Sequence, residues 1–379
     1  MTNKRKAWIG VAAVALVVAI VVLLLNIIWH RQADTIAIGA VLPLSGESAQ
    51  YGKWIREGLE LGKEEINAKG GVKGKSLVIV YEDDAATPKD AANAMQKLVR
   101  INKVPVVFGS WASSCVLAQA PIAEQSHTVL IGEAISPKIR YAGDYVFRIQ
   151  PDARFYLRQL VPFVYSKLNI RTVSILYVNN DFGIDQANVF TKEFSKLGGK
   201  VLYSEGYNQN VTDFRTQLLK IKESAPEAVF VPGYAELGII LKQARELGLS
   251  QRFLGSVPSE NPDVLETAGD AAEGLIYPSH FDPDSRNNLV QRYQKAYKIR
   301  YRRSSEGFAA LAYDGIRIIA HVINEVGESP EEIKDGLYNI HDFPGVTGKT
   351  TFDDHGDVVK PIVIKVVRNG QFRIWEENK

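Results

Sequence analysis

The chain has 379 residues and a formal net charge of +2, with 46% hydrophobic and 23% charged residues. This composition is typical of a folded globular protein and excludes an intrinsically disordered one. The single cysteine, Cys115, excludes an intramolecular disulfide and a cysteine-based metal cluster. Because no basic block follows the first few residues, the charge pattern gives no indication of nucleic-acid binding.

An unbroken apolar run at residues 7–29 directly follows three basic residues, KRK (4–6). About 20 apolar residues are enough to cross a bilayer as a helix, and basic residues on a short flank tend to stay in the cytoplasm. The run therefore predicts a single-pass anchor in the cell membrane, with residues 1–6 cytoplasmic and the main domain extracytoplasmic. The alternative is a cleaved signal peptide. However, secretory apolar regions are shorter, about 7 to 15 residues, and end in small residues, whereas HRQAD (30–34) follows here.

Beyond this run, short β-rich runs alternate with helical patterns, which predicts βαβ units around parallel sheets. Roughly 345 residues remain there, more than one hydrophobic core usually holds, so we expect two lobes. A helical pattern through Ile55, Leu59 and Ile66 in the first lobe ends at Gly70-Gly71. The predicted strands of the first lobe are residues 35–42, 77–81, 104–109, 129–132 and 145–149.

The same rhythm restarts after Pro151 without repeating the sequence itself. Helical patterns that contain Phe190 and Phe194, or Leu218 and Ile221, separate further apolar runs. The predicted strands of this second set are residues 173–178, 201–204, 228–231 and 253–254. The pattern is completed by helical stretches at 285–300 and 306–326 and by β-like runs at 361–367 and 371–375.

Motifs for catalysis or metal binding are not found. None of the six histidines lies at a familiar ligand spacing from another histidine or a carboxylate, and no G-x-S-x-G or G-x-x-x-x-G-K-[ST] motif occurs. The acidic pair Asp83-Asp84 is interpreted as a solvated strand end that leads into a helix cap at Thr87. We therefore expect no catalytic residue, no metal, no cofactor and no enzymatic activity.

Serine residues follow two of the predicted strands. Ser113 and Ser114 lie between the strand at 104–109 and a helical stretch. Hydroxyl and free N–H groups at a helix N-terminus suit a carboxylate or another anion, although most such serines only cap the helix. Ser136 follows the next strand and could face the same crevice, because ligands lie beyond the carboxyl ends of parallel strands.

Five segments together resemble one protein family. They are SGESAQYG (45–52), EINAKGGVKGKSLVIVYEDDAATP (65–88), GSWASS (109–114), PGYAELGIILKQARELGL (232–249) and GVTGKTTFDDHGDVVKP (345–361). In this order they resemble the leucine/isoleucine/valine-binding protein family, the type I periplasmic binding proteins that supply ABC importers. The resemblance covers the chain from residue 36 to its C-terminus. It implies two Rossmann-like α/β lobes with parallel sheets, joined by a three-crossover hinge that closes around a ligand.

The resemblance also implies that each lobe is built from two stretches of chain. The crossings are expected near residues 149–150, 278 and 345, and the ligand is expected in the cleft between the lobes. The expected lobes are 34–149 plus 279–344 for lobe 1 and 150–278 plus 345–379 for lobe 2.

Roles follow for residues that match the family's binding positions. Ser113 corresponds to the serine that holds the ligand's α-carboxylate, and Tyr234 corresponds to the tyrosine that donates its hydroxyl to that carboxylate from the other lobe. The expected walls of the site are Tyr51, Trp111, Ala112 and Phe182, together with the segment Glu133, Ala134, Ile135 and Ser136.

Two positions depart from the family pattern. Ile135 stands where a threonine is usual, so that hydroxyl is lost, and Ser136 beside it either substitutes or does not. Val257 stands where the family has a glutamate for the ligand's ammonium. A buried ammonium without a counter-charge costs several kcal/mol. Either the ligand has no ammonium, or another acid, Glu133 or Glu260, has replaced that glutamate.

The resemblance implies an extracytoplasmic solute-binding protein of an ABC importer that captures branched-chain or related apolar amino acids without chemistry. The expected partners are this small-molecule ligand, an ABC permease with its ATPase, and the membrane through residues 7–29. A tether would raise the local concentration near the permease. Two alternatives stay open: a ligand-binding sensor subunit that signals through a separate protein, and a binder of a non-amino-acid carboxylate or amide.

Overall fold

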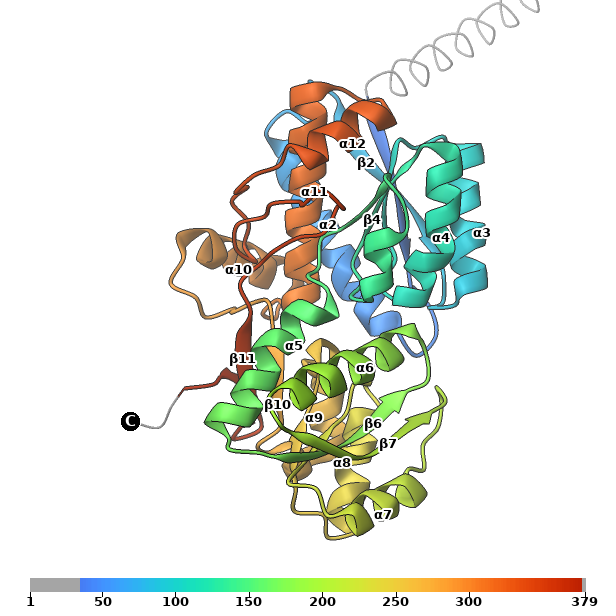
Figure 1. Ribbon diagram of the computed structural model, residues 1–379. Helices are drawn as coiled ribbons and strands as arrows, with labels where there is room; N and C mark the ends of the chain where they lie inside the picture. Colours follow the sequence, from blue (N-terminus) through green and yellow to red (C-terminus); the bar gives the residue numbers. More distant parts are fainter. Residues whose placement is uncertain (1–34, 377–379) are drawn as a thin grey trace, which may run out of the picture.

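Two separate β-sheets form the framework of the computed structural model, which describes residues 35–376. The sheets lie one above the other in Figure 1. The predicted membrane anchor at residues 7–29 lies outside the described residues. Between residues 35 and 376, no helix combines the length and the apolar composition needed to cross a bilayer.

The sheet of the first lobe has five strands, and every neighbouring pair is parallel. Their order across the sheet is β2 (Ser76–Asp83), β1 (Thr35–Leu42), β3 (Val106–Gly109), β4 (Val129–Gly132) and β5 (Val146–Arg148). Val107 and Phe108, neighbours on β3, belong to different hydrophobic clusters. This explains why the strands are continuously apolar, since helices cover both faces of a parallel sheet.

Two pairs of helices cover these faces. One pair is α3 (Pro88–Lys97) and α4 (Ser113–Ser126), and the other is α2 (Ala49–Ala68) and α11 (Gly307–Val326). Two further helices of this lobe, α12 (Pro330–Tyr338) and α10 (Asn288–Tyr301), pack beside α11 and α2. The hydroxyl of Tyr301 on α10, for example, donates to the backbone oxygen of Glu57 at 3.0 Å.

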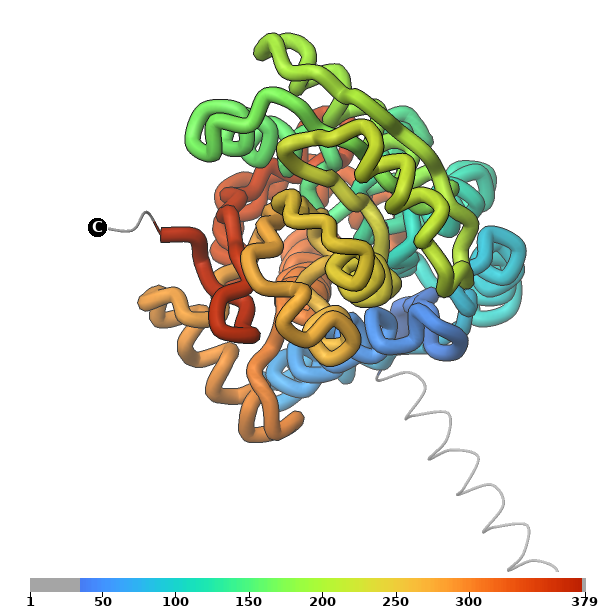
Figure 2. Tube along the Cα trace, turned by 90° about the horizontal axis from the view of Figure 1, so that it is seen from below, coloured from blue at the N-terminus to red at the C-terminus, as the bar shows by residue number. Residues whose placement is uncertain are grey.

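The sheet of the second lobe has seven strands and mixed directions. Its order is β12 (Gln371–Ile374), β11 (Val363–Arg368), β10 (Ile276–Ser279), β9 (Arg252–Leu254), β8 (Ala228–Phe230), β6 (Thr172–Val178) and β7 (Lys200–Tyr207). Only the pairs that involve β11 are antiparallel. Seen from below in Figure 2, the C-terminal strands β11 and β12 lie at one side of the second lobe.

Helices also surround the second sheet. They are α5 (Ala153–Pro162), α6 (Asp181–Lys196), α7 (Arg215–Ser224), α8 (Leu237–Glu246) and α9 (Pro262–Ala268). Short 3-10 or π-helical segments occupy Leu98–Asn102, Pro137–Tyr141, Phe163–Lys167, Val257–Ser259 and Gly269–Ala272. The predicted α/β fold with parallel sheets is therefore confirmed, although β10, α9 and α12 were not predicted from the sequence.

The chain passes between the lobes at three places. It leaves the first sheet after Arg148 at the end of β5, and it returns after Ser279 at the end of β10. The third passage differs from the expected position at residue 345. Backbone N–H of Arg148 donates to the oxygen of Gly356 at 3.0 Å, and the ring of Phe352 packs edge-on against Phe147 with centroids 5.5 Å apart. Residues 345–358 thus cover the edge strand of the first sheet before the chain crosses.

Each passage carries a buried polar side chain that is bonded to its surroundings. Arg148 donates through Nε to Asp357 Oδ1 at 2.5 Å and through Nη1 to the backbone oxygen of Ser136 at 2.8 Å. His280 Nδ1 lies 2.7 Å from the hydroxyl of Tyr156. At the third passage, Lys360 Nζ donates to the hydroxyls of Thr347 and Thr350, each at 2.7 Å. Buried polar groups need such partners, so these bonds fix the conformation of the three connections.

Helices α2 and α11 approach closely because glycines lie at their contact. A Cβ placed on Gly58 would lie 2.1 Å from the backbone oxygen of Ala309, and one on Gly62 would lie 2.3 Å from Cγ2 of Ile316. No real Cβ tolerates such distances, and backbone atoms cannot rotate away. The spacing of these two helices therefore depends on the missing side chains.

We predict that Gly58→Ala destabilises the fold by about 1–3 kcal/mol, because the added methyl forces α2 away from α11. Chemical denaturation of the purified variant measures the free energy of unfolding. The matched control is Lys53→Ala on the exposed face of the same helix, which we expect to change stability by less than about 0.5 kcal/mol. Equal stability of the Gly58 variant and the wild type would contradict the close packing described here.

Candidate ligand-binding site

The N-terminus of α4 faces the second lobe and carries Ser113 as its first residue. The Ser113 side chain is buried, and its Oγ accepts a hydrogen bond from the backbone N–H of Ser136 at 3.2 Å. Because that bond uses the oxygen as an acceptor, the hydroxyl hydrogen can still be donated to a ligand. The free N–H groups of this 14-residue helix add positive potential at the same point. The arrangement suits a carboxylate.

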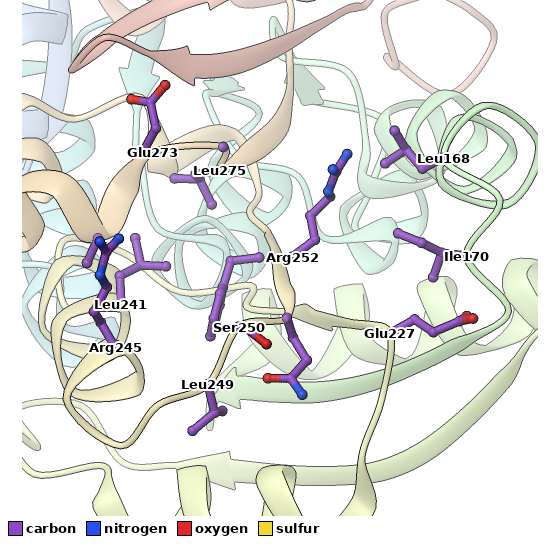
Figure 3. Close-up of a pocket in the computed structure, with 14 residues that line it drawn as sticks. Leu168, Ile170, Glu227, Leu241, Arg245, Leu249, Ser250, Arg252, Glu273 and Leu275 are labelled. Carbon is purple, nitrogen blue, oxygen red and sulfur yellow. The ribbon is translucent and has the colours of Figure 1, made fainter.

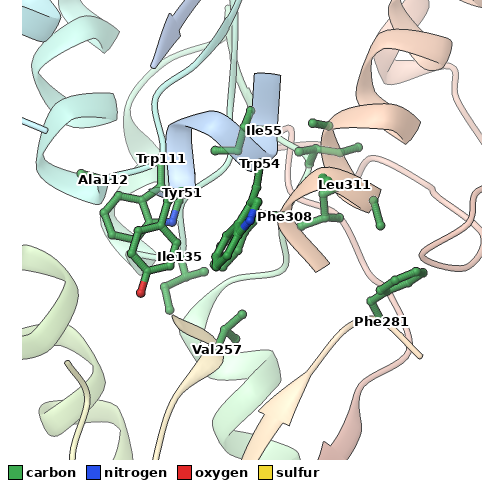
Figure 4. Close-up of a cluster of buried hydrophobic side chains, with 14 of the residues drawn as sticks. Tyr51, Trp54, Ile55, Trp111, Ala112, Ile135, Val257, Phe281, Phe308 and Leu311 are labelled. Carbon is green, nitrogen blue, oxygen red and sulfur yellow. The ribbon is translucent and has the colours of Figure 1, made fainter. Parts of the chain in front are cut away.

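Aromatic rings from both lobes meet in front of this helix end. Trp111 and Tyr51 lie side by side in Figure 4. Their rings stack with centroids 4.2 Å apart, and the Trp111 ring lies 4.9 Å from that of Tyr234 in the second lobe. Phe182, on the first turn of α6, stacks on Tyr234 with ring centroids 4.8 Å apart. Phe308, at the start of α11, packs edge-on against Tyr51 at 5.5 Å. These contacts form an apolar, water-excluding surround.

The two tyrosine hydroxyls are held by amides and a backbone oxygen. Tyr51 donates to the backbone oxygen of Pro258 and accepts from Asn261 Nδ2, both at 3.2 Å, so it joins the two lobes. Tyr234 accepts from Asn180 Nδ2 at 3.1 Å. Burial raises the pKa of both phenols well above the usual value. Both therefore remain protonated at neutral pH, and Tyr234 retains a hydrogen to donate.

A small cavity lies between these groups, with a volume of about 10 Å³. Its size is close to the minimum for one water molecule. Six of the predicted site residues line it: Trp111, Ser113, Ala134, Ile135, Phe182 and Tyr234. Three further lining residues, Gln150, Pro258 and Phe308, were not predicted. Phe308 and Gln150 lie far from the recognised segments, and no local sequence signal separates them from ordinary core or hinge residues.

The other predicted residues lie beside the cavity rather than in its wall. Ala112 precedes Ser113 as the N-cap of α4, and Tyr51 lies behind the ring of Trp111. Ser136 does not present its hydroxyl to the cavity, because that group donates to Asp185 Oδ2 on α6. The hydroxyl that Ile135 lacks is therefore not supplied by Ser136.

Glu133 does not line the cavity itself but directly precedes the lining residue Ala134, and its buried carboxyl has no hydrogen-bond partner in the described fold. It is 1% exposed, and neither carboxylate oxygen makes a hydrogen bond within residues 35–376. Burial and then the nearby Glu306 raise the pKa of Glu133 well above its usual value, against the opposing charge of Lys360. An unpartnered carboxyl at such a depth is costly, so it requires an explanation beyond packing.

Glu260 and Val257, unlike Glu133, have no unpaired charge. Glu260 forms a buried ion pair with Lys365 and also accepts from the hydroxyl of Ser279 at 2.9 Å. Its charge is therefore already neutralised by a neighbouring strand. Val257 belongs to the same apolar cluster as Tyr51 and Trp111 (Figure 4). Neither position offers a free charge to the cleft, which leaves Glu133 as the unpaired acid among the predicted residues.

Polar side chains of the two lobes also meet at the rim of the site. Asp185 accepts the hydrogen bond from Ser136, and its Oδ1 lies 3.6 Å from Lys138 Nζ. The Lys138 ammonium also donates to Asp181 Oδ1 at 2.6 Å. Lys138 and Ser136 belong to the first lobe, and both aspartates lie on α6 of the second. These contacts form only when the lobes are close together. We call Ser136, Lys138, Asp181 and Asp185 the interlobe latch.

Among the larger cavities of the described residues, two bear on this assignment. One of about 240 Å³ adjoins the site across Tyr51 and Tyr234 and contains the carboxylates of Glu47, Glu236 and Asp263. The other, of about 510 Å³, lies in the second lobe among residues such as Leu241, Arg245 and Arg252 (Figure 3), and shares no residue with the predicted site. Across residues 35–376, no group of three His, Cys, Asp or Glu side chains is placed to hold a metal ion.

This geometry defines a class of protein: two α/β lobes on three connections, with a polar and aromatic site between them. The sequence model of the periplasmic binding protein family matches residues 35–371, and the chain belongs to this family. This match and the relatives described next confirm the resemblance to the leucine/isoleucine/valine-binding proteins.

Similar proteins support this assignment. A leucine-, isoleucine-, valine-, threonine- and alanine-binding protein of Pseudomonas aeruginosa is 31% identical over 357 residues, which cover 93% of this chain and 92% of that protein. A branched-chain amino acid transporter substrate-binding protein of Streptococcus pneumoniae, solved with isoleucine, is 29% identical with a TM-score of 0.84, covering 90% and 99% of the two chains. A leucine-binding protein of Thermotoga maritima has 27% identity and a TM-score of 0.86, with 90% and 98% covered.

We predict that Asp185→Ala opens the interlobe latch and shifts the protein toward separated lobes, because Lys138 and Ser136 both lose a partner. Small-angle scattering should give a larger radius of gyration for the variant than for the wild type. The control is Lys196→Ala, which removes an ion pair with Glu193 within α6 and should leave the radius unchanged. An unchanged radius for Asp185→Ala would show that these contacts do not hold the lobes together.

We also predict that Glu133→Gln stabilises the fold at high pH. The folded state keeps the Glu133 proton to a higher pH than the unfolded state, so the wild type loses stability as pH rises above the ordinary carboxyl range. The variant should be more stable by about 1–3 kcal/mol at pH 8 and should match the wild type at about pH 4. Denaturant titrations at both pH values measure this difference.

The control for this comparison is Glu223→Gln, which removes an exposed carboxyl from α7. It should show no pH-dependent gain. A Glu133→Gln variant that is less stable than the wild type at pH 8 would mean that the carboxylate has a stabilising partner in the fold.

Proposed function

We propose that this protein is the extracytoplasmic solute-binding protein of an ABC importer, which captures an apolar amino acid of the branched-chain or a related kind. One observation carries the proposal. Ser113, at the N-terminus of α4, and Tyr234, from the other lobe, line the same small cavity. A carboxylate between them would be bound by both lobes at once, so binding and closure would be coupled.

The ligand's carboxylate accepts hydrogen bonds from the Ser113 hydroxyl, from N–H groups of the α4 N-terminus and from the Tyr234 hydroxyl. Hydrogen bonds to a charged group contribute about 1.5–3 kcal/mol each. The aromatic surround excludes water, which strengthens these bonds. The apolar lining by Ile135, Phe182 and Phe308 favours an aliphatic side chain. No bond is made or broken in this process: the protein binds, closes and releases.

Glu133 is the acid that we assign to the ligand's ammonium. It is buried and has no partner in the described fold, and it directly precedes the cavity residues Ala134 and Ile135. Glu260 is unsuitable because Lys365 already neutralises it. An ammonium beside Glu133 would replace an unfavourable isolated carboxyl by an ion pair, and this gain would select amino acids over keto acids, which lack the ammonium. Amino-acid amides keep the ammonium, and they are disfavoured because they lack the carboxylate that Ser113 and Tyr234 bind.

Opening of the lobes is required for entry, since the lobes are in contact across the cleft. We place residues 35–149 and 280–359 in the first lobe and residues 150–279 and 360–376 in the second. The boundary near residue 359 reflects the packing of Phe352 and Gly356 on β5. The three connections then act as the hinge.

The membrane and the transporter provide the setting for this cycle. We propose that the apolar run at 7–29 anchors the protein with residues 1–6 in the cytoplasm. The binding domain then stays close to its permease and the associated ATPase. A closed, ligand-bound domain presents both lobes to the permease at once, and opening releases the amino acid into it.

Titration calorimetry tests this function on the purified chain. Leucine, valine and alanine should bind, while the matching keto acids and amides should bind at least about tenfold more weakly, equivalent to 1.4 kcal/mol. Ser113→Ala should weaken amino-acid binding by about 10-fold to 100-fold through loss of a charge-assisted bond. Ser126→Ala, at the other end of α4, is the control and should bind as the wild type does.

Glu133→Gln distinguishes binding of the ligand's ammonium from binding of its carboxylate. It should reduce binding of the amino acids and leave the weak keto-acid binding unchanged. Preferential binding of keto acids by the wild type would contradict the assignment of Glu133 and would favour a carboxylate without an ammonium. Preferential binding of amides, which keep the ammonium, would instead contradict the carboxylate contacts of Ser113 and Tyr234. Unchanged binding in Ser113→Ala would contradict the site itself.

A further inference from the structure

Trp111 lies at the centre of the contacts between the lobes. It follows β3 and precedes α4, in a loop of three residues. Its ring touches Tyr51 of the first lobe at 4.2 Å and Tyr234 of the second at 4.9 Å, and it lies 6.3 Å from Phe308. The indole is 5% exposed. It therefore occupies much of the space between the lobes beside the cavity that Ser113 also lines.

The cavity next to this ring is too small for an aliphatic side chain. It holds about 10 Å³, whereas an engineered apolar cavity that binds benzene has a volume of about 150 Å³. A bound amino acid must therefore push the lobes apart, and the displacement grows with the size of its side chain. Each additional displacement weakens interlobe contacts such as the bond from Asn261 to Tyr51, which is 3.2 Å long here.

The adjoining cavity of about 240 Å³ does not relieve this crowding for an apolar ligand. It shares Tyr51 and Tyr234 with the site, but its other walls include the carboxylates of Glu47, Glu236 and Asp263. Burial and the neighbouring Glu47 raise the pKa of Glu236, although its bond from Tyr207 opposes the shift. An aliphatic side chain placed there would remove these charged groups from water without offering any hydrogen bond.

We propose that Trp111 restricts the ligand to amino acids with small apolar side chains, so that alanine and valine bind more tightly than leucine and phenylalanine. This inference rests on the proposed function and narrows its substrate class. Trp111 acts as a specificity-determining residue because its ring, rather than the lobes' main chain, occupies the ligand's side-chain space. A ring smaller than indole would leave room for a longer side chain with the same carboxylate contacts.

Trp111 is also replaceable without loss of a hydrogen bond. Among the bonds of residues 35–376, none uses its indole N–H, whereas the hydroxyls of Tyr51 and Tyr234 are bonded. An apolar substitution therefore leaves no buried polar partner unsatisfied. Trp111→Leu and Trp111→Phe replace the indole by an aliphatic side chain and by a smaller aromatic ring. Thermal melts establish that each variant is folded.

Calorimetric titration of the full chain with alanine, valine, leucine and phenylalanine tests the inference. In the wild type, alanine or valine should bind at least about tenfold more tightly than leucine, because even one extra methylene group is discriminated about tenfold or more in a tight pocket. Trp111→Leu should gain at least about tenfold for leucine relative to alanine, and Trp111→Phe should lie between. Trp375→Leu removes an indole near the C-terminus, where it packs on Phe163, and should keep the wild-type order.

Two outcomes would overturn the inference. If the wild type prefers leucine and this preference is the same in Trp111→Leu, the indole does not select by size. In that case, loss of leucine binding in Ser113→Ala would show that the proposed function still holds. If no amino acid binds to the wild type or to either folded Trp111 variant, the proposed function and the size selection both fail.

Discussion

The fold depends on how its two sheets are connected. Three connections join the lobes, and Arg148 lies fully buried at the first of them. Its guanidinium joins Asp357 on the third connection to the backbone of Ser136 beside the site. Removing one partner of such a buried pair costs about 3–5 kcal/mol because the other charge is left uncompensated. The same contacts that define the hinge therefore also position the residues that follow β4.

This constraint explains why the site can be both apolar and selective. The ends of β3 and β4 bring Ser113 and Ile135 to one point, and the second lobe brings Tyr234 to face them. Few charges can be tolerated in such a dry region. Glu133 is the exception among the predicted site residues, since it is buried without a partner. A group that weakens the free protein but would be paired by a ligand is expected at a binding site rather than in a structural core.

Much of the fold could be predicted from the sequence, because parallel strands are continuous apolar runs bounded by turn residues. The bounds of β1 and β4 agree with the prediction residue for residue. Strand β10 was missed because Pro278 argues against a strand, yet it pairs opposite Ile364 of the antiparallel β11. Helix α12 was missed although Ser329 and Glu332 form a capping box before and within it.

The candidate site was only partly predictable. Ser113 and Tyr234 lie next to strand ends and in segments with a family resemblance, so both local pattern and resemblance indicated them. Phe308 had neither signal, because a phenylalanine at helical spacing is usually predicted to be a residue of the hydrophobic core. The partners of Ser136 and Lys138 on α6 depend on how close the lobes lie, which no local pattern specifies. The third crossing was placed too early because the packing of Phe352 on Phe147 is a long-range contact.

The central claim is that a ligand's carboxylate is held between the two lobes by Ser113 and Tyr234. A crystal structure of the protein grown with valine tests it most directly. We predict carboxylate oxygens within hydrogen-bond distance, about 3 Å, of Ser113 Oγ and the Tyr234 hydroxyl, with the ammonium beside Glu133. Valine bound in the cavity beside Glu236, or held by one lobe alone with its carboxylate away from the α4 N-terminus, would contradict the account.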